Sequence, residues 1–333
     1  MNYPAAETGL SRRQWAGLAG WIGVWFLPLI WIDPTTYAVL SVAGLTMGML
    51  LFLTSAGLTL VFGLMDVLNF AHGAFFAWGA YLGFSVFNVL NARGWVEMGG
   101  LGRNVSSLLL ALAVAAGIGL ILGVLLERVI IRRVYGSHLK QILITLGASL
   151  VLAEIIKIVW GPNDEVMLVP GVFQGSIDVA DVVISRYRLL ALLVGVIVFA
   201  LIYFFLKRTK LGIIVRGGVE NREMVQALGY NIHRIFTGVF ASGAALAAMG
   251  GVMWAIFKEQ IHPGMGEENL IFAFIVVILG GMGSVTGCFL GAVMVGLAYN
   301  YMAFLAPKLA LGVNILIMAI ILLLKPKGLL GTD

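Results

Sequence analysis

Three side chains that could bind a polar solute or relay a proton lie close together in a very apolar stretch of the chain. They are Asp66, Asn69 and His72, in FGLMDVLNFAHGAFF. An isolated charge at mid-membrane costs roughly 2.5 to 3.5 kcal/mol, so ionisable groups kept inside a membrane are usually functional. The i, i+3, i+6 spacing drifts but places the three residues on roughly one helical face. Thr145, in ITLGAS, is a candidate companion that offers an uncharged hydroxyl.

Two interpretations of this stretch stay open. In the first, it is a cytoplasmic turn between two membrane spans. In the second, a helix break presents the polar side chains to an internal cavity, where irregular backbone is tolerated within a membrane. The joint contains no Lys, Arg or Pro, which favours the second interpretation. The three residues and Thr145 are therefore candidates for a translocation pathway.

Residues suited to enzyme chemistry or metal binding are sparse. The four histidines are scattered, and none belongs to an H-E-x-x-H pair. The single cysteine, Cys288, has no partner for a disulfide or for a Cys/His metal site. Glu154 and Lys157 lie one helical turn apart, where a mutual ion pair is favoured over a substrate contact. We therefore expect no enzyme activity, no metal and no cofactor in this chain.

Glycine-rich motifs do not supply a nucleotide site either. The sequence has no G-x-x-x-x-G-K-[ST] loop, and GGMGSVTG at residues 280–287 has the wrong spacing for a dinucleotide fingerprint. The recurrence of Gly283, Gly287 and Gly291 every four residues instead favours close helix packing in lipid. The alternative is a glycine-broken re-entrant turn, which would include Gly280 and Gly281.

The composition predicts that membrane-spanning helices carry these residues. Of the 333 residues, 61% are hydrophobic and 11% are charged, whereas soluble domains carry about 25% charged residues. We expect one all-α polytopic domain over residues 1–333, with about 8–10 transmembrane or re-entrant helices. The expected spans are Trp15–Trp31, Tyr37–Leu60, Ala71–Leu90, Ser106–Glu127, Gln141–Trp160, Leu189–Leu206, Ile235–Phe257, Leu270–Leu279, Thr286–Phe304 and Leu309–Leu324. The eighth of these is too short to cross unaided and could be a half-helix.

Basic residues predict the orientation of the spans, because Lys and Arg collect on cytoplasmic loops. If the chain starts inside and alternates, most of its 21 basic residues fall in the cytoplasm. Both termini are then cytoplasmic, as is a loop over about residues 207–234, while residues 160–188 lie outside. The same rule accounts for the net charge of +5, so we expect membrane lipid and no nucleic acid as a partner.

The cytoplasmic segment KRTKLGIIVRGGVENREMVQALGYNIHRI, residues 207–235, is mostly too polar to enter lipid. Asn221 or Glu220 can cap a short helix whose first turn holds Glu223, where a negative charge suits the helix dipole. Gly229 can supply the left-handed residue that ends such a helix. The sequence therefore predicts a short helix within this loop.

This short helix has a small apolar face. Met224, Ala227 and Leu228 fall at i, i+3 and i+4. A two-turn helix is marginal alone in water, so the face needs a partner. From the residues alone, a cytoplasmic protein and the lipid headgroups are about equally good partners.

Four stretches carry a family resemblance when they are taken together. They are GLTLVFGLMDVLNFAHGAFFAWGAYLG (57–83), ITLGASLVLAEIIKIVWGP (144–162), VENREMVQALGYNIHRIFTGVFASGAALAAMGG (219–251) and ILGGMGSVTGCFLGA (278–292). Their order and spacing resemble the ABC-importer permeases of the branched-chain amino-acid class, over most of residues 40–330. The chain is similar to the shorter of the two related membrane subunits in that family. The segment up to about Trp31 resembles the family least.

The resemblance implies a function and a set of partners. It implies a coupling helix that docks on an ATPase subunit, formed by Glu220, Asn221, Arg222, Glu223, Met224, Ala227, Leu228 and Gly229. The implied partners are a related second permease subunit, two cytoplasmic ATPase subunits that hold ATP and Mg, and an extracytoplasmic solute-binding protein. The chain would then translocate branched-chain amino acids or a similar small polar solute across a bacterial inner membrane.

The alternative function is a self-contained channel or an ion-coupled secondary carrier for a small solute such as urea or an amide. In that case the ionisable residues Glu154, Lys157, Asp66 and His72 would form ion or proton sites.

Overall fold

The computed structural model describes residues 27–179 and 182–330. Within these ranges it describes every side chain except those of Leu27, Leu64, Val179, Val219, Glu220 and Arg222. The predicted first span, Trp15–Trp31, falls largely outside the described residues. The part of it that is described contains the short helix η1 (Leu27–Ile30).

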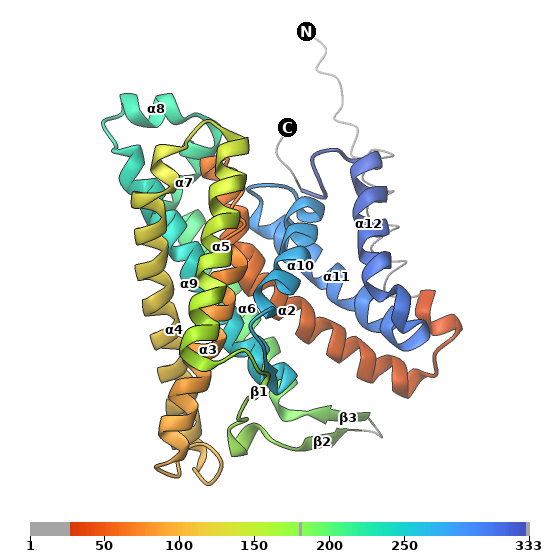
Figure 1. Ribbon diagram of the computed structural model, residues 1–333. Helices are drawn as coiled ribbons and strands as arrows, with labels where there is room; N and C mark the ends of the chain where they lie inside the picture. Colours follow the sequence, from red (N-terminus) through yellow and green to blue (C-terminus); the bar gives the residue numbers. More distant parts are fainter. Residues whose placement is uncertain (1–26, 180–181, 331–333) are drawn as a thin grey trace.

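Nine long helices make up most of the described chain (Figure 1). They are α2 (Pro34–Met65), α3 (His72–Asn91), α4 (Leu101–Val129), α5 (His138–Trp160), α6 (Arg186–Arg208), α9 (Ile232–Lys258), α10 (Met265–Gly280), α11 (Val285–Leu305) and α12 (Ala310–Leu324). Two shorter helices, α7 (Lys210–Glu220) and α8 (Arg222–Ala227), join α6 to α9. The 3-10 turns are η2 (Ile131–Arg133), η3 (Gly171–Phe173) and η4 (Pro307–Leu309).

Eight helices among the described residues are long and apolar enough to cross a membrane. The protein is therefore a polytopic, multi-pass membrane protein. Each predicted span from Tyr37 onward corresponds to one long helix. The predicted Leu270–Leu279 piece is the helix α10, which begins earlier, at Met265, and has 16 residues. It remains shorter than the roughly 20 residues that a perpendicular crossing needs.

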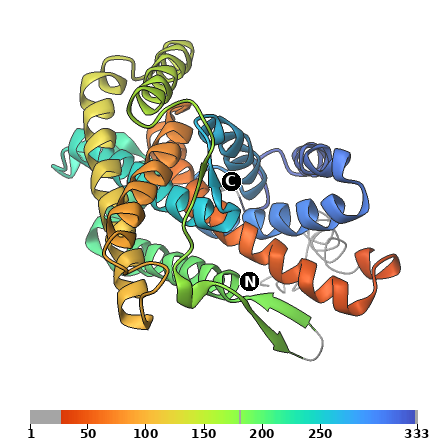
Figure 2. The ribbon, with the colours of Figure 1, turned by 60° about the horizontal axis from the view of Figure 1, so that its bottom comes forward.

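The long helices α2 and α9 form the centre of the bundle. In the most apolar 18-residue window of each, 83% of the residues are buried, compared with 17% for α5, α6 and the last span. α2 runs obliquely across the bundle beside α11 and α9 (Figure 2), and α9 also packs on α3 and α4. The outer helices therefore present apolar side chains to lipid or to another membrane subunit.

Glycines let these central helices approach closely. A Cβ built on Gly57 of α2 would lie 2.6 Å from the Cα of Gly243 on α9. A Cβ on Gly79 of α3 would overlap the carbonyl oxygen of Ala248 on α9. In lipid, no hydrophobic effect drives helices together. Small residues at such crossings stabilise the helix pairs through close van der Waals contact instead.

Two small antiparallel sheets lie at the end of the bundle opposite α8 (Figure 1). β1 (Glu165–Val166) pairs with β4 (Gln260–Ile261), and β2 (Ser176–Val179) pairs with β3 (Val182–Ser185). The all-α prediction omitted these strands. The β1–β4 pairing ties the loop after α5 to the end of α9, and such long-range pairing leaves no local pattern in two-residue strands.

Candidate functional site

The segment between α6 and α9 folds as two short helices in series, each with its own side-chain cap. The amide of Gly212 donates to Thr209 Oγ1 at 3.0 Å, which caps α7. The amide of Met224 donates to Asn221 Oδ1 at 2.9 Å, which caps α8. Gly229 follows α8 with φ +87°, in the left-handed region. The predicted short helix is thus present, with Asn221 rather than Glu220 as its cap.

The helix α7 was not predicted from the sequence. Its signals are the Thr209 cap and the apolar residues Leu211, Ile214 and Val215 at i, i+3 and i+4. Lys210 and Arg216 flank these residues on either side, and Gly212 lies among them, so the segment did not resemble a helix. The loop is therefore more ordered than its polar composition suggested.

The helix α8 is anchored on one side and exposed on the other. Val225 is only 3% exposed and packs toward α7, on the side of Gly217. Met224 is 48% exposed and Leu228 is 68% exposed, and Ala227 between them is exposed too. This set of three residues, called the α8 face below, is an apolar surface at one tip of the molecule (Figure 1). Glu223 is exposed in the first turn of the helix.

The side chains of Glu220 and Arg222, also named as coupling residues, lie outside the described part of the structure. The next helix begins directly after α8, because Asn231 Oδ1 accepts the amide of Arg234 at 3.3 Å and caps α9. Only three residues, from Leu228 to Tyr230, separate α8 from this cap. The link between α8 and α9 is therefore short.

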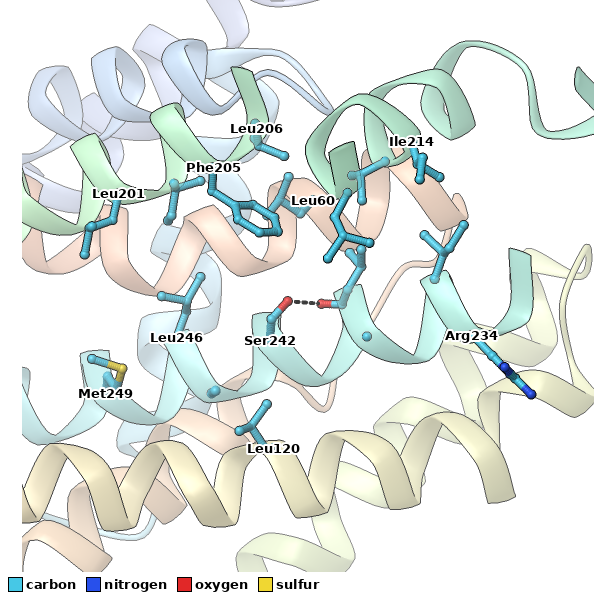
Figure 3. Close-up of a pocket in the computed structure, with 17 residues that line it drawn as sticks. Leu60, Leu120, Leu201, Phe205, Leu206, Ile214, Arg234, Ser242, Leu246 and Met249 are labelled. Carbon is cyan, nitrogen blue, oxygen red and sulfur yellow. Dashed lines mark hydrogen bonds between the residues drawn. The ribbon is translucent and has the colours of Figure 1, made fainter. Parts of the chain in front are cut away.

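An apolar groove of about 690 Å³ lies beneath α7 (Figure 3). Side chains from α2, α4, α6, α7 and α9 line it, among them Leu60, Leu120, Phe205, Ile214 and Leu246. Ser242 of α9 keeps its hydroxyl satisfied by donating to the carbonyl of Val239 at 3.0 Å (Figure 3). Because this space is not filled by side chains, α7 can shift against α6 and α9 without breaking a close-packed core.

The stretch with Asp66, Asn69 and His72 is a break between two helices. α2 ends at Met65, Asp66 adopts the left-handed conformation with φ +54°, and α3 begins at His72. The expected shared helical face is wrong, because residues 66–71 are not helical. Asp66 is exposed and its Oδ2 lies 3.5 Å from His138 Nε2, whereas Asn69 and His72 are buried.

Local hydrogen bonds hold this break in place. The amide of Phe70 donates to Thr145 Oγ1 at 3.2 Å, and Asn69 Oδ1 accepts the amide of Ala71 at 3.1 Å. His72 Nε2 lies 2.8 Å from the carbonyl oxygen of Thr54. Thr145 is thus brought to the break by α5. A role of these residues in translocation stays a prediction.

The other two motifs named from the sequence also have a place in the structure. Glu154 and Lys157 form an ion pair, with 2.6 Å between Oε1 and Nζ, on an exposed part of α5. Gly280 and Gly281 end α10, and a Cβ on Gly287 of α11 would overlap the carbonyl oxygen of Gly280.

The turn between α10 and α11 also needs glycine for its backbone. Gly281 and Gly283 have φ of +100° and +81°. A Cβ on Gly291 would lie 3.0 Å from the carbonyl oxygen of Val276. The two helices therefore form a tight hairpin.

No cluster of three or more metal-ligating side chains occurs in the described ranges 27–179 and 182–330. The candidate site consists of the α8 face, its link to α9 and the helix break between α2 and α3.

Comparison with known proteins identifies the family of this chain. The family model "Branched-chain amino acid transport system / permease component" matches residues 40–324. The high-affinity branched-chain amino acid transport system permease protein BraD of Pseudomonas aeruginosa is 31% identical, over 87% of this chain and 94% of its own length. The corresponding protein LivH of Salmonella typhimurium is 29% identical, over 86% of this chain and 93% of its own length.

A shorter stretch, 34% of this chain, is 31% identical to the probable branched-chain amino acid transport permease protein LivM of Methanocaldococcus jannaschii and covers 35% of that protein. No solved structure matches the chain significantly. The family model and the long alignments to BraD and LivH, together with eight apolar helices, show that this chain belongs to the family of permease components of branched-chain amino acid transport systems.

Proposed function

We propose that this chain is the shorter transmembrane subunit of an ATP-driven importer of branched-chain amino acids, and that an ATPase subunit binds its α8 face. The observation that carries the proposal is the exposure of Met224, Ala227 and Leu228 on a short helix that is capped and anchored. An exposed apolar face on a rigid, two-turn helix is suited to a groove on a partner protein.

The partners follow from what the chain lacks and from its relatives. The sequence carries no phosphate-binding loop, so ATP and Mg would be held by two cytoplasmic ATPase subunits. The partial similarity to LivM supports a related second permease subunit beside this one. An extracytoplasmic binding protein would deliver the amino acid, and the assembly would lie in a bacterial inner membrane.

The proposed mechanism is a population shift between two arrangements of the bundle. ATP binding and hydrolysis in the partner would favour different positions of α8. The short link at residues 228–230 passes this displacement to α9, which contacts α2, α3 and α4 along its length. The groove beneath α7 leaves room for α7 to follow. Outward-open and inward-open states would then alternate.

The experiment compares two single substitutions that add the same charge to α8. Ala227→Arg places a guanidinium in the middle of the apolar α8 face, and we expect it to lower amino acid-stimulated ATPase activity of the complex at least about tenfold, the effect of a buried unpaired charge. Gln226→Arg is the matched control, because Gln226 is exposed on the opposite side of the same helix. It should leave the activity within about twofold of the wild type.

Both variants should insert in the membrane at wild-type levels, which a membrane blot checks. Equal activity of the two variants would contradict docking through the α8 face. Amino acid uptake by this chain alone in liposomes, without any ATPase, would instead support the channel or carrier. Of the four residues that this alternative would use, Asp66, Glu154 and Lys157 are exposed, and His72 is buried with its Nε2 2.8 Å from the Thr54 carbonyl oxygen.

A further inference from the structure

A small polar pocket of about 250 Å³ lies at the end of α9 opposite α8. Helices α2, α9, α10 and α11 and the strand β4 supply its walls, near the lower end of the bundle in Figure 1. This pocket is separate from the α8 face and from the helix break. Nothing in the mechanism above uses it.

The rim of this pocket carries both signs of charge. Lys258 is the last residue of α9, and its Nζ lies over the Trp254 ring, 5.5 Å from the ring centroid. Glu268, in the first turn of α10, lies 3.6 Å from His262 through its Oε2. In the described part of the chain Lys258 forms no ion pair with a carboxylate, so the positive and negative ends of the rim do not neutralise each other.

The interior of the pocket holds an unpaired buried acceptor. Asn269 is only 4% exposed, and its Nδ2 donates to the carbonyl of Met265 at 2.9 Å. Its Oδ1 accepts no hydrogen bond from the described residues. Buried amide oxygens nearly always have a donor, and leaving one without a partner is unfavourable. The oxygen has less than 1 Å² of accessible surface, so the polar contacts of a ligand are assigned to the rim of the pocket.

The remaining walls are apolar and adaptable. Met47 and Met265 are buried, and Phe272 and Tyr299 pack edge to face with ring centroids 5.4 Å apart. Methionine side chains adjust to ligands of different branching. An engineered apolar cavity of about 150 Å³ holds benzene, so 250 Å³ is enough for a somewhat larger molecule such as an aliphatic amino acid.

We propose that this pocket binds a zwitterionic α-amino acid with an apolar side chain. Its carboxylate faces Lys258, and its ammonium group faces Glu268, while the Gln260 amide stays hydrogen-bonded to Asp164 Oδ2 at 2.8 Å. The aliphatic side chain lies against the methionines and Phe272. The inference rests on the proposed function for the supply of the amino acid, and it goes further by assigning the residues that select a zwitterion on the face opposite the ATPase.

A metal site is a poor explanation of the same cluster. His262 and Glu268 have no third metal-ligating side chain beside them among the described residues. A simple anion or cation would satisfy only one side of the rim. A molecule with one charge of each sign satisfies both sides at once.

Binding of radiolabelled L-leucine to the purified full-length chain in lipid nanodiscs, without ATP, tests the assignment. Unlabelled valine should compete. Leucinol, which lacks the carboxylate, and 4-methylpentanoate, which lacks the ammonium group, should each compete at least about tenfold more weakly, the cost of losing one charge-assisted hydrogen bond. Lys258→Met and Glu268→Gln should each weaken leucine binding by a similar factor.

Glu267→Gln is the matched control, because Glu267 precedes Glu268 on α10, is exposed and does not line the pocket. It should bind leucine like the wild type. Equal competition by leucinol and leucine, or unchanged affinity in both Lys258→Met and Glu268→Gln, would overturn the pocket assignment. Neither result touches the proposed function, which fails only if uptake needs no ATPase or is insensitive to Ala227→Arg.

Discussion

Glu127 ties three segments together at the α8 end of the bundle. This residue of α4 is fully buried, with 0% exposure. Its Oε1 accepts the Tyr135 hydroxyl at 2.6 Å, and its Oε2 accepts the Thr237 hydroxyl at 2.6 Å. Thr237 lies in the first two turns of α9, directly after the link from α8. The carboxylate thus fixes the first part of α9 against α4, close to the proposed docking surface.

Thr237→Val should destabilise the protein, because valine keeps the shape of threonine but leaves Glu127 Oε2 without its buried donor. Leaving a buried acceptor unpaired costs about 1–3 kcal/mol, and more when the acceptor is charged. We expect a lower midpoint of thermal unfolding in detergent, measured by intrinsic fluorescence.

Thr237→Ser, which retains the hydroxyl, is the control for this substitution and should unfold close to the wild-type temperature. If Thr237→Val and Thr237→Ser had the same unfolding midpoint, the hydrogen bond to Glu127 would make no measurable contribution to stability.

At the scale of helices and strands, the positions of the long helices follow from their glycines as much as from their apolar residues. The crossing of α3 and α9 is the tightest example, since Gly79 faces the backbone of Ala248 and Gly251 faces the backbone of Phe76. Backbone atoms cannot swing aside as a flexible side chain can. These crossings therefore fix the distance between the central helices.

Gly79→Ala should push α3 away from α9 and destabilise the bundle by about 1–3 kcal/mol or more, the usual cost of overpacking a core. Gly117→Ala, on α4, is the matched control, because a Cβ there meets no atom within 4 Å. The control should be neutral or slightly stabilising, since alanine is the better helix former. Size-exclusion profiles and unfolding midpoints of the two variants give the comparison.

The sequence alone predicted the helices whose determinants lie close together along the chain. The apolar runs predicted all nine long helices of the described part, and the residues Asn221 and Gly229 predicted both ends of α8. The helix α7 was missed because its short apolar run is flanked by Lys210 and Arg216 and contains the poor helix former Gly212. The contact between Glu127 and Thr237 joins positions 110 residues apart. The pocket around Asn269 gathers residues from four helices. Residue spacing along the chain therefore could not predict the Glu127–Thr237 contact or this pocket.

At the scale of the whole molecule, two ends of the bundle differ in character. One end carries the basic α7–α8 segment and the α8 face. The other carries the two small sheets and the polar pocket (Figure 1). The distribution of Lys and Arg predicts that the α8 end is cytoplasmic. This orientation is a requirement of the proposed function, because the ATPase subunits act from the cytoplasm.

Cysteine labelling in intact cells measures the orientation directly. The native Cys288 is buried and should not react. Gln174→Cys, at the sheet end, should react with a membrane-impermeant maleimide added outside, because Gln174 is exposed. Leu228→Cys, on the α8 face, should react only after the membrane is permeabilised. Labelling of Leu228→Cys from outside would reverse the orientation and exclude a cytoplasmic ATPase at this face.

The helix α9 spans the distance between the two ends by itself. Its 27 residues correspond to a rod of about 40 Å, with Asn231 at its start and Lys258 at its end. If the proposed amino acid site and the proposed ATPase site each favour one position of this helix, their affinities are thermodynamically linked. The factor by which bound amino acid would change the affinity for the ATPase then equals the factor by which bound ATPase would change the affinity for the amino acid.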